Sequence, residues 1–274
     1  MISKKIKPVT IGVIALFSLL GCKQEVKPEI ESKETNKQTE VVEKSDIFYH
    51  YSIWHAFVNK IFEGDITAAE VKANGDIGLG SYNLLDGELI MLDGKLYQAK
   101  EDGSVITPTD DTKVVYANAT FFDTDDSFEL GEIADYETLR KHINEKLETK
   151  NMFYAFKIHG EFTKIKCGGL HKQEKPFKDG LDVLIPNRPI FERENFSGTM
   201  VSFFCPEFIG DINASGYHLH FVSDDETFAG HVMEFEAKSL RVEIDQIHEY
   251  KFVLPQTKEY KNVGFDKAFQ YKKQ

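Results

Sequence analysis

The stretch from Gly216 to Val232 constrains the fold of this chain more than any other, because three of the nine histidines lie within it. His218 and His220 are two residues apart, so on a strand they share one face. The polar run from Ser223 to Thr227 predicts a turn between two apolar segments. The stretch is therefore typical of a β-hairpin with histidines on one face.

In a hairpin that is symmetric about this turn, His220 lies directly opposite His231. Directly opposed residues have Cβ atoms about 5 Å apart, and His218 is then the diagonal neighbour at about 7 Å. Three imidazoles converging from one face match the ligands of a catalytic zinc site with an open fourth position. The alternative is that each ring is a hydrogen-bonded histidine of an ordinary core. We favour the metal site, because a third histidine in register joins the first two.

Residues 1–21 have the pattern of a secretory signal peptide. Lysines precede the apolar run Val9–Leu20, which is well short of the roughly 20 residues that a spanning helix needs. The ending Leu19-Leu20-Gly21-Cys22 resembles a bacterial lipobox, which implies cleavage before Cys22 and a lipid on its thiol. An ordinary secretory signal with a coincidental cysteine is the alternative. We expect an exported lipoprotein, anchored to a membrane of the cell envelope through this lipid alone.

Residues 22–45 consist mostly of Lys, Glu, Gln, Thr, Ser and Asn, with few large apolar side chains. Such a segment cannot bury enough surface to offset the entropy lost on ordering. We therefore predict a lipidated, disordered tether that leads to a folded part beginning near residue 46.

Charge and cysteine content exclude several classes of protein. The formal net charge of −12 argues against a nucleic-acid partner, because phosphate binding needs clustered Lys and Arg. With Cys22 lipidated, Cys167 and Cys205 are the remaining cysteines, too few for a disulfide framework. The pair could still form one bond in an oxidising compartment.

Local patterns predict a chain rich in strands. The apolar spacing between Asp46 and Glu63 favours an amphipathic helix, and Tyr136–Leu147 reads as another. Asp-Gly pairs such as Asp93-Gly94 predict tight hairpins between apolar runs. His159-Gly160 is interpreted as one more hairpin turn, between Met152–Ile158 and Glu161–Lys166.

Several segments together resemble the bacterial α-acetolactate decarboxylase family. They occur in unbroken order over roughly residues 47–255, and the histidine hairpin is similar to the family's zinc motif. The matching segments are Gly78–Asn83, Leu85–Leu89, Leu92–Gln98, Asn151–Ala155, Gln173–Phe177, Gly198–Met200 and Cys205-Pro206.

The resemblance implies an α/β protein of the α+β type, with possible homodimers. It implies an N-terminal mixed β-sheet with helices, which we assign to residues 46–150. A C-terminal β-barrel-like domain that carries the metal site is assigned to residues 151–274.

The resemblance also implies a carboxy-lyase that decarboxylates 2-acetolactate (2-hydroxy-2-methyl-3-oxobutanoate) to acetoin through an enediolate. Its implied cofactor is Zn²⁺ on His218, His220 and His231, acting as a Lewis acid. Glu88 matches an active-site glutamate of the family, and a carboxylic acid of raised pKa could deliver the proton. The alternative for Glu88 is a solvent-facing glutamate on a hairpin strand.

Two features depart from the family pattern, and one of them is a family glutamate near the C-terminus that has no counterpart in the tail Phe269–Gln274. Gly168 stands where the family has an arginine that engages the substrate, and a carboxylate site loses affinity without its guanidinium. Either His171, Lys172 or Arg188 supplies the charge, or the substrate differs, or activity is weak.

Two other functions stay open. The chain could be a catalytically weakened, lipid-anchored homologue that binds a metal or a small molecule. A cupin-like metalloenzyme is suggested by His-x-His before Glu226, although the spacing to His231 fits that pattern poorly. We favour the decarboxylase, because the three histidines, Glu88 and the surrounding segments occur together.

Overall fold

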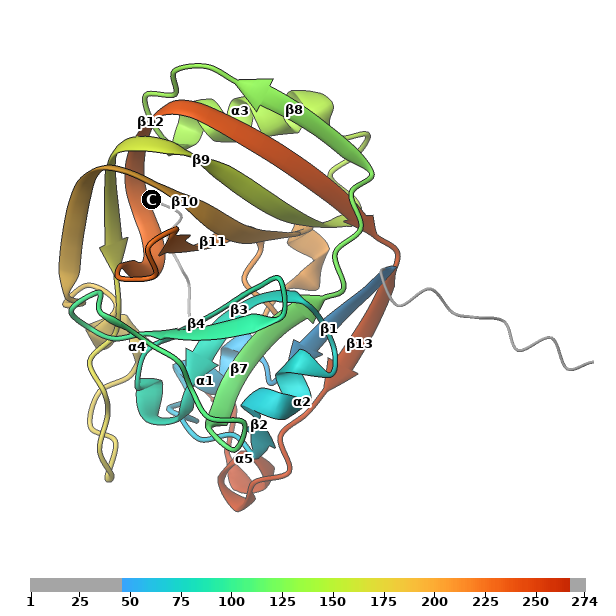
Figure 1. Cartoon of the computed structure of the whole chain (residues 1–274). Helices are drawn as coiled ribbons and strands as arrows, with labels where there is room; N and C mark the ends of the chain where they lie inside the picture. Colours follow the sequence, from blue (N-terminus) through green and yellow to red (C-terminus); the bar gives the residue numbers. More distant parts are fainter. Residues whose placement is uncertain (1–45, 267–274) are drawn as a thin grey trace, which may run out of the picture. The chain divides into compact units, whose positions relative to one another are not determined.

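The structure is a computed structural model that describes residues 46–266. It has the predicted α+β fold, dominated by strands in two β-sheets (Figure 1). The predicted signal peptide, the lipidation site Cys22 and the tether lie outside the described residues. Among residues 46–266, no helix is both long enough and apolar enough to cross a membrane.

The first sheet is mixed, as predicted. Its strands are β1 (Ile47–Tyr51), β2 (Ile66–Thr67), β3 (Ile77–Tyr82), β4 (Glu88–Leu92), β5 (Lys95–Ala99), β6 (Val105–Ile106), β7 (Lys113–Thr120) and β13 (Glu249–Val253). Within the described part of the chain the order is β13-β1-β7-β3-β4-β5-β6, and β2 pairs with β7. β1 and β13 are parallel to each other, and the other strand pairs of this sheet are antiparallel.

The second sheet is antiparallel and strongly curled (Figure 1). Its strands are β8 (Asp126–Leu130), β9 (Phe153–Gly168), β10 (Ile190–Cys205), β11 (Gly216–Ser223) and β12 (Ala229–Ile247). Their order over residues 46–266 is β11-β10-β9-β12-β8, and β11 pairs with β12 as well. Because β11 pairs with both β10 and β12, the sheet curves back on itself at the end that carries the histidines.

The helices are short, and those at 68–72, 136–146 and 258–262 begin at a residue whose side chain accepts a backbone hydrogen bond. They are α1 (Trp54–Val58), α2 (Ala68–Lys72), α3 (Tyr136–Lys146), α4 (Leu181–Leu184) and α5 (Lys258–Asn262), with 3₁₀ turns η2 (Asn83–Leu85) and η3 (Glu207–Ile209). At α2 the Thr67 side chain accepts a hydrogen bond from the Glu70 N–H, and the Glu70 carboxylate accepts one from the Thr67 N–H. This reciprocal pair satisfies two N–H groups at the start of the helix that would otherwise lack partners.

The two sheets share a hydrophobic layer. Phe48 and Ile90 of the first sheet pack with Val201 and Phe203 of the second, and all four are buried. Burial of each such side chain contributes about 1.5–3 kcal/mol. This layer fixes β4 under the histidine hairpin, so the packing that stabilises the fold also positions the site.

Two strands connect the halves that were predicted as domains. β8 lies before residue 150 but pairs with β12 in the second sheet. β13 lies after residue 150 but pairs with β1 in the first sheet. The boundary between residues 46–150 and 151–274 stays a prediction.

Two local predictions are wrong. The predicted helix over residues 46–63 is wrong in its extent, because only α1 (Trp54–Val58) is α-helical within it. The range begins with β1, whose residues are buried on both faces and so lack the alternation typical of a strand. The predicted turn at His159-Gly160 lies inside β9, which is continuous. A Cβ on Gly160 would lie 2.2 Å from Ser239 O of β12, so this glycine allows close approach of two strands. The Asp93-Gly94 turn is confirmed, with φ of 49° and 76° as a tight hairpin requires.

Asp245 gives the fold a testable dependence on pH. The residue is 1 % exposed on β12 and accepts a hydrogen bond from the Asp123 N–H. Burial, together with the nearby negative charges of Asp125 and Asp46, raises its pKa to about 8.

An aspartate in the unfolded chain has its ordinary pKa of 3.8, whereas folded Asp245 keeps its proton until about pH 8. Unfolding therefore releases a proton between these values, and stability falls as pH rises, by up to about 1.4 kcal/mol per pH unit. We expect Asp245→Asn to remove this slope, measured by urea unfolding at pH 5, 7 and 8. The exposed control Asp126→Asn should keep it, and parallel curves for wild type and Asp245→Asn would contradict the prediction.

Candidate metal and active site

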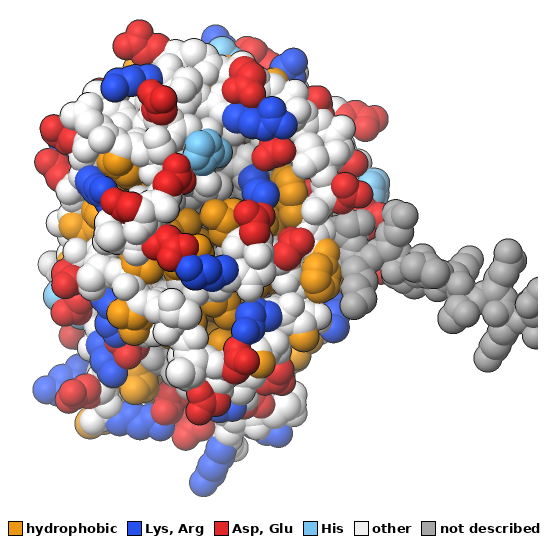
Figure 2. Space-filling view, viewed as in Figure 1, with side chains coloured by type: hydrophobic (Ala, Val, Ile, Leu, Met, Phe, Trp, Pro, Cys, Tyr) orange, Lys and Arg blue, Asp and Glu red, His pale blue; other side chains and the backbone are white. Residues whose placement is uncertain are grey.

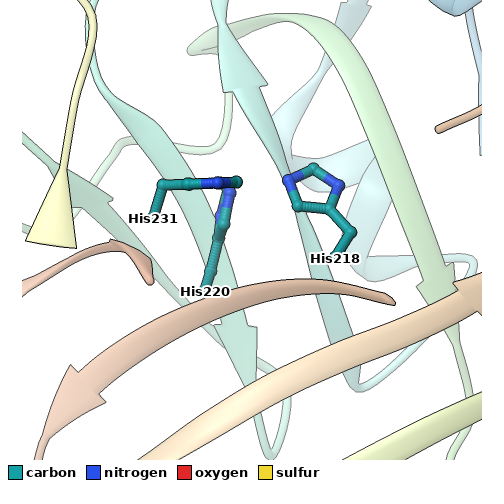
Figure 3. A group of neighbouring side chains, drawn as sticks. All are labelled: His218, His220 and His231. Carbon is teal, nitrogen blue, oxygen red and sulfur yellow. The ribbon is translucent and has the colours of Figure 1, made fainter. Parts of the chain in front are cut away.

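The predicted register of the histidine hairpin is confirmed: β11 and β12 are antiparallel, and His220 lies opposite His231. The ring centroid of His218 is 4.9 Å from that of His220 and 5.1 Å from that of His231. Figure 3 shows the three imidazoles converging from the two strands, and one nitrogen of each lies within 4.8 Å of the others. Together these side chains could hold one metal ion.

The hairpin is attached to the first sheet at two places. His220 Nδ1 lies 2.9 Å from Leu89 O on β4, and at the turn Glu226 accepts hydrogen bonds from Lys95 Nζ (2.6 Å) and the Tyr97 hydroxyl (2.9 Å) on β5. Because a carbonyl only accepts, Nδ1 of His220 carries the proton. The lone pair is then on Nε2, which faces the other two rings.

Burial keeps the three imidazoles neutral. It lowers the pKa of His220 to about 4, and it holds the pKa values of His218 and His231 well below the ordinary value. The neighbouring imidazoles and the positive charge of Arg188 act in the same direction on His218 and His231. Neutral imidazoles are the form that binds metal ions, so the cluster does not need to lose protons first.

Glu88, at the start of β4, lies beside the cluster. Its Oε2 atom is 3.7 Å from His220 Nε2, and its side chain is 12 % exposed. Burial raises the pKa of Glu88 to about 7, against the opposing charge of Arg188. Near neutral pH this carboxyl can therefore both hold and release a proton, as a general acid must.

A tight turn at a glycine delivers Glu88 to this position. Gly87 has φ of 105°, and a Cβ there would lie 2.6 Å from Ala99 O. Asp86 beside it accepts hydrogen bonds from both Lys100 and Lys172. Glycine supplies the left-handed turn and the close approach, while the two lysines fix the loop from outside.

The three side chains that could replace the charge of the missing arginine lie in different places. His171 Nδ1 is 2.9 Å from Glu101 Oε2, and Lys172 Nζ is 3.0 Å from Asp86 Oδ2; both candidate side chains are exposed. Arg188 instead acts electrostatically on Glu88 and on the histidines. Gly168 lies on β9 directly opposite His231.

The two remaining cysteines are free. Cys167 and Cys205 are both buried, and burial raises the pKa of each thiol. The sequence allowed either one disulfide or two free thiols, and the structure has the free thiols. Neither is activated as a nucleophile, because activation requires a lowered pKa.

No sequence pattern indicates the role of Leu89. Its carbonyl orients His220, and a backbone group has no residue-type signature. The position of Arg188 could be predicted only as one of three possibilities, because a long side chain reaches far from its own Cα.

Comparisons with known proteins all point to one family. The family model described as alpha-acetolactate decarboxylase matches residues 48–267. The alpha-acetolactate decarboxylase of Brevibacillus brevis is 34% identical over 238 residues, which are 87% of this chain and 80% of that protein. The crystal structure of alpha-acetolactate decarboxylase from Bacillus subtilis strain 168 superposes with a TM-score of 0.77 at 32% identity, covering 81% of this chain and 94% of that one.

We expect His220→Ala to abolish stoichiometric metal binding. Wild type should carry about one zinc ion per chain, and the variant should carry close to none, because one of three ligands and the contact that orients it are both lost. Elemental analysis after dialysis measures this, with circular dichroism to check the fold. His159→Ala, an exposed histidine on β9, is the matched control. Full zinc content in His220→Ala would rule out the assigned ligand set.

Proposed function

Because the chain belongs to the alpha-acetolactate decarboxylase family, we propose that it decarboxylates 2-acetolactate to acetoin with the help of zinc. The observation that carries the proposal is the juxtaposition of three neutral imidazoles with a carboxyl whose pKa is raised to about 7. The three imidazoles can bind a metal ion, and the carboxyl can transfer a proton.

The residues present fit a zinc ion. His218 Nδ1 and His220 Nε2 are buried and have no hydrogen-bond partner among residues 46–266. Buried polar atoms without partners are costly, and binding a metal would satisfy them. Three neutral imidazoles would leave the charge of a bound zinc ion undiminished, and zinc would supply a Lewis acid toward the ketone and hydroxyl oxygens of the substrate.

We assign Glu88 as the acid that donates the proton that the reaction needs. When the bond to the carboxylate breaks, carbon dioxide leaves, and the electron pair passes to the neighbouring carbonyl to give an enediolate. Protonation of the carbon that lost the carboxylate then yields acetoin. A Glu88 carboxylic acid can give this proton, and it regains one from water at neutral pH because its pKa is about 7.

The alternative is a homologue that binds a metal or small molecule but turns over slowly or not at all. The buried carboxyl argues for the enzyme, because a binding protein has no need for an acid poised near neutral pH. A homodimer and the lack of a nucleic-acid partner stay predictions.

Export and membrane anchoring through a lipid on Cys22 form a further part of the proposal. It rests on the lipobox pattern at Leu19-Leu20-Gly21-Cys22. Decarboxylation would then occur in the cell envelope.

Purified, zinc-loaded protein should form acetoin from acetolactate, and Glu88→Gln should lower kcat by about 10²–10⁴-fold, the usual worth of a general acid. Zinc content should not change, because glutamine keeps the shape of the side chain and the histidines remain. Glu161→Gln, at an exposed position on β9, is the control. The role of Glu88 would be excluded if kcat stayed at the wild-type value.

Wild-type protein expressed in a bacterium should enter the detergent phase of a temperature-induced partition. Cys22→Ser should move it to the aqueous phase, since the acyl chains provide the membrane affinity. Complete recovery of wild type in the aqueous phase would disprove the lipid anchor.

A further inference from the structure

Gly168 belongs to a row of residues that share the face of the site. His220 on β11 lies opposite His231 on β12, and His231 lies opposite Gly168 on β9. Directly opposed residues of antiparallel strands project to the same face of a sheet, about 5 Å from each other. A side chain at position 168 would therefore extend beside the histidines.

The space beside Gly168 is filled by another residue. A Cβ on Gly168 would lie 2.7 Å from Cδ of Arg188 and 3.0 Å from Sδ of Met233. The stem of Arg188 thus crosses the glycine on the face that carries the histidines. Glycine is needed here because any larger residue would displace this stem.

Arg188 is held in place by its own segment. Both its backbone N–H (3.3 Å) and its Nε (3.1 Å) donate to Ile185 O, at the end of α4. The Gly169 N–H donates to Pro189 O at 3.2 Å, which ties the segment to the end of β9. With the stem anchored, the two terminal nitrogens of the guanidinium remain for another acceptor.

The charge of Arg188 is not neutralised by an ion pair within the described residues. Among residues 46–266, no Asp or Glu forms an ion pair with it, whereas Lys172 and His171 are each paired with a carboxylate outside the site. Its charge acts on Glu88 and on all three histidines. An arginine that is half-buried beside the histidine cluster and has no acidic partner among residues 46–266 is typical of a binding site for an anion.

We infer that Arg188, which reaches the site across Gly168, binds the carboxylate of the substrate. The inference rests on the proposed function and names the group that recognises the acid. The guanidinium can donate two parallel hydrogen bonds to the carboxylate. It holds the bond that breaks in a fixed orientation beside the histidines, and it is a substrate-binding residue with no share in proton transfer.

A matched pair of ligands tests this role without turnover. In 2,3-dihydroxy-2-methylbutanoate the substrate ketone is reduced, so the compound keeps the carboxylate but cannot lose carbon dioxide. In 2-methylbutane-2,3-diol a methyl group replaces that carboxylate. Calorimetry on zinc-loaded protein should show that Arg188→Gln weakens binding of the acid by roughly 30-fold or more, with the affinity for the diol unchanged.

Three variants complete the test. Arg188→Lys should restore part of the affinity for the acid, because it keeps the charge but not the two-pronged geometry. Arg241→Gln, which removes an exposed arginine of β12, should bind both ligands as wild type does. Gly168→Arg should weaken binding of the acid, because the new stem would collide with that of Arg188. Zinc content and circular dichroism establish that each variant is folded and loaded.

The outcomes separate this inference from the proposed function. If wild type forms acetoin and Arg188→Gln binds the acid as tightly as wild type, Arg188 does not bind the carboxylate and the decarboxylase assignment stands. If Lys172→Gln instead lowers the affinity for the acid but not for the diol, the carboxylate lies near the Asp86 loop and the inference is overturned. If wild type forms no acetoin, the proposed function fails, while selective loss of the acid in Arg188→Gln would still identify Arg188 as a carboxylate-binding residue.

Discussion

The site depends on the pairing of β11 with β12. This pairing sets His220 against His231, and a slip of one residue would move every side chain of a strand to the opposite face. The register is well determined, because β11 also pairs with β10 through Gly198 to Cys205. A Cβ on Gly198 would lie 2.2 Å from the Phe221 ring, so a glycine on the neighbouring strand gives the core side chain its space. The packing of the core and the geometry of the histidine cluster are thus fixed by the same contacts.

The charge pattern on the surface supports this arrangement. Figure 2 shows acidic and basic side chains intermixed over one face of the molecule, with hydrophobic side chains between them. Within residues 46–266, exposed ion pairs between Lys95 and Glu226 and between Lys157 and Asp93 link the parts of the chain that carry the two sheets. Each exposed pair contributes only about 0–1 kcal/mol. Their effect is to restrict how the second sheet and its hairpin turn lie over β4 and β5, because the hydrophobic layer alone has no directional preference.

Much of the site could be predicted from short-range patterns, and the parts that could not depend on distant contacts. The His-x-His spacing and the polar turn predict the hairpin because pairing across a short turn is local. The 19-residue strand β12 runs unbroken through Lys238-Ser239, although its register with β9 shifts there, and continuity across such a shift depends on the partner strand. β1 was missed because its partner β13 lies some 200 residues later in the chain, and no local pattern reports such a pairing.

The departure at Gly168 shows why a missing side chain cannot be equated with a missing charge. The position of a guanidinium is set by where its stem ends, and an arginine stem spans several ångströms from its Cα. A glycine at one position therefore allows an arginine from another segment to cross it, as the 2.7 Å approach of Arg188 Cδ illustrates. The cost is that the second segment must be rigid, since a flexible arginine loses entropy on binding. The two hydrogen bonds to Ile185 O provide that rigidity before any ligand arrives. Comparing sequences at position 168 alone shows that an arginine is lost. The packing of β9 against the segment after α4 shows that Arg188 takes its place.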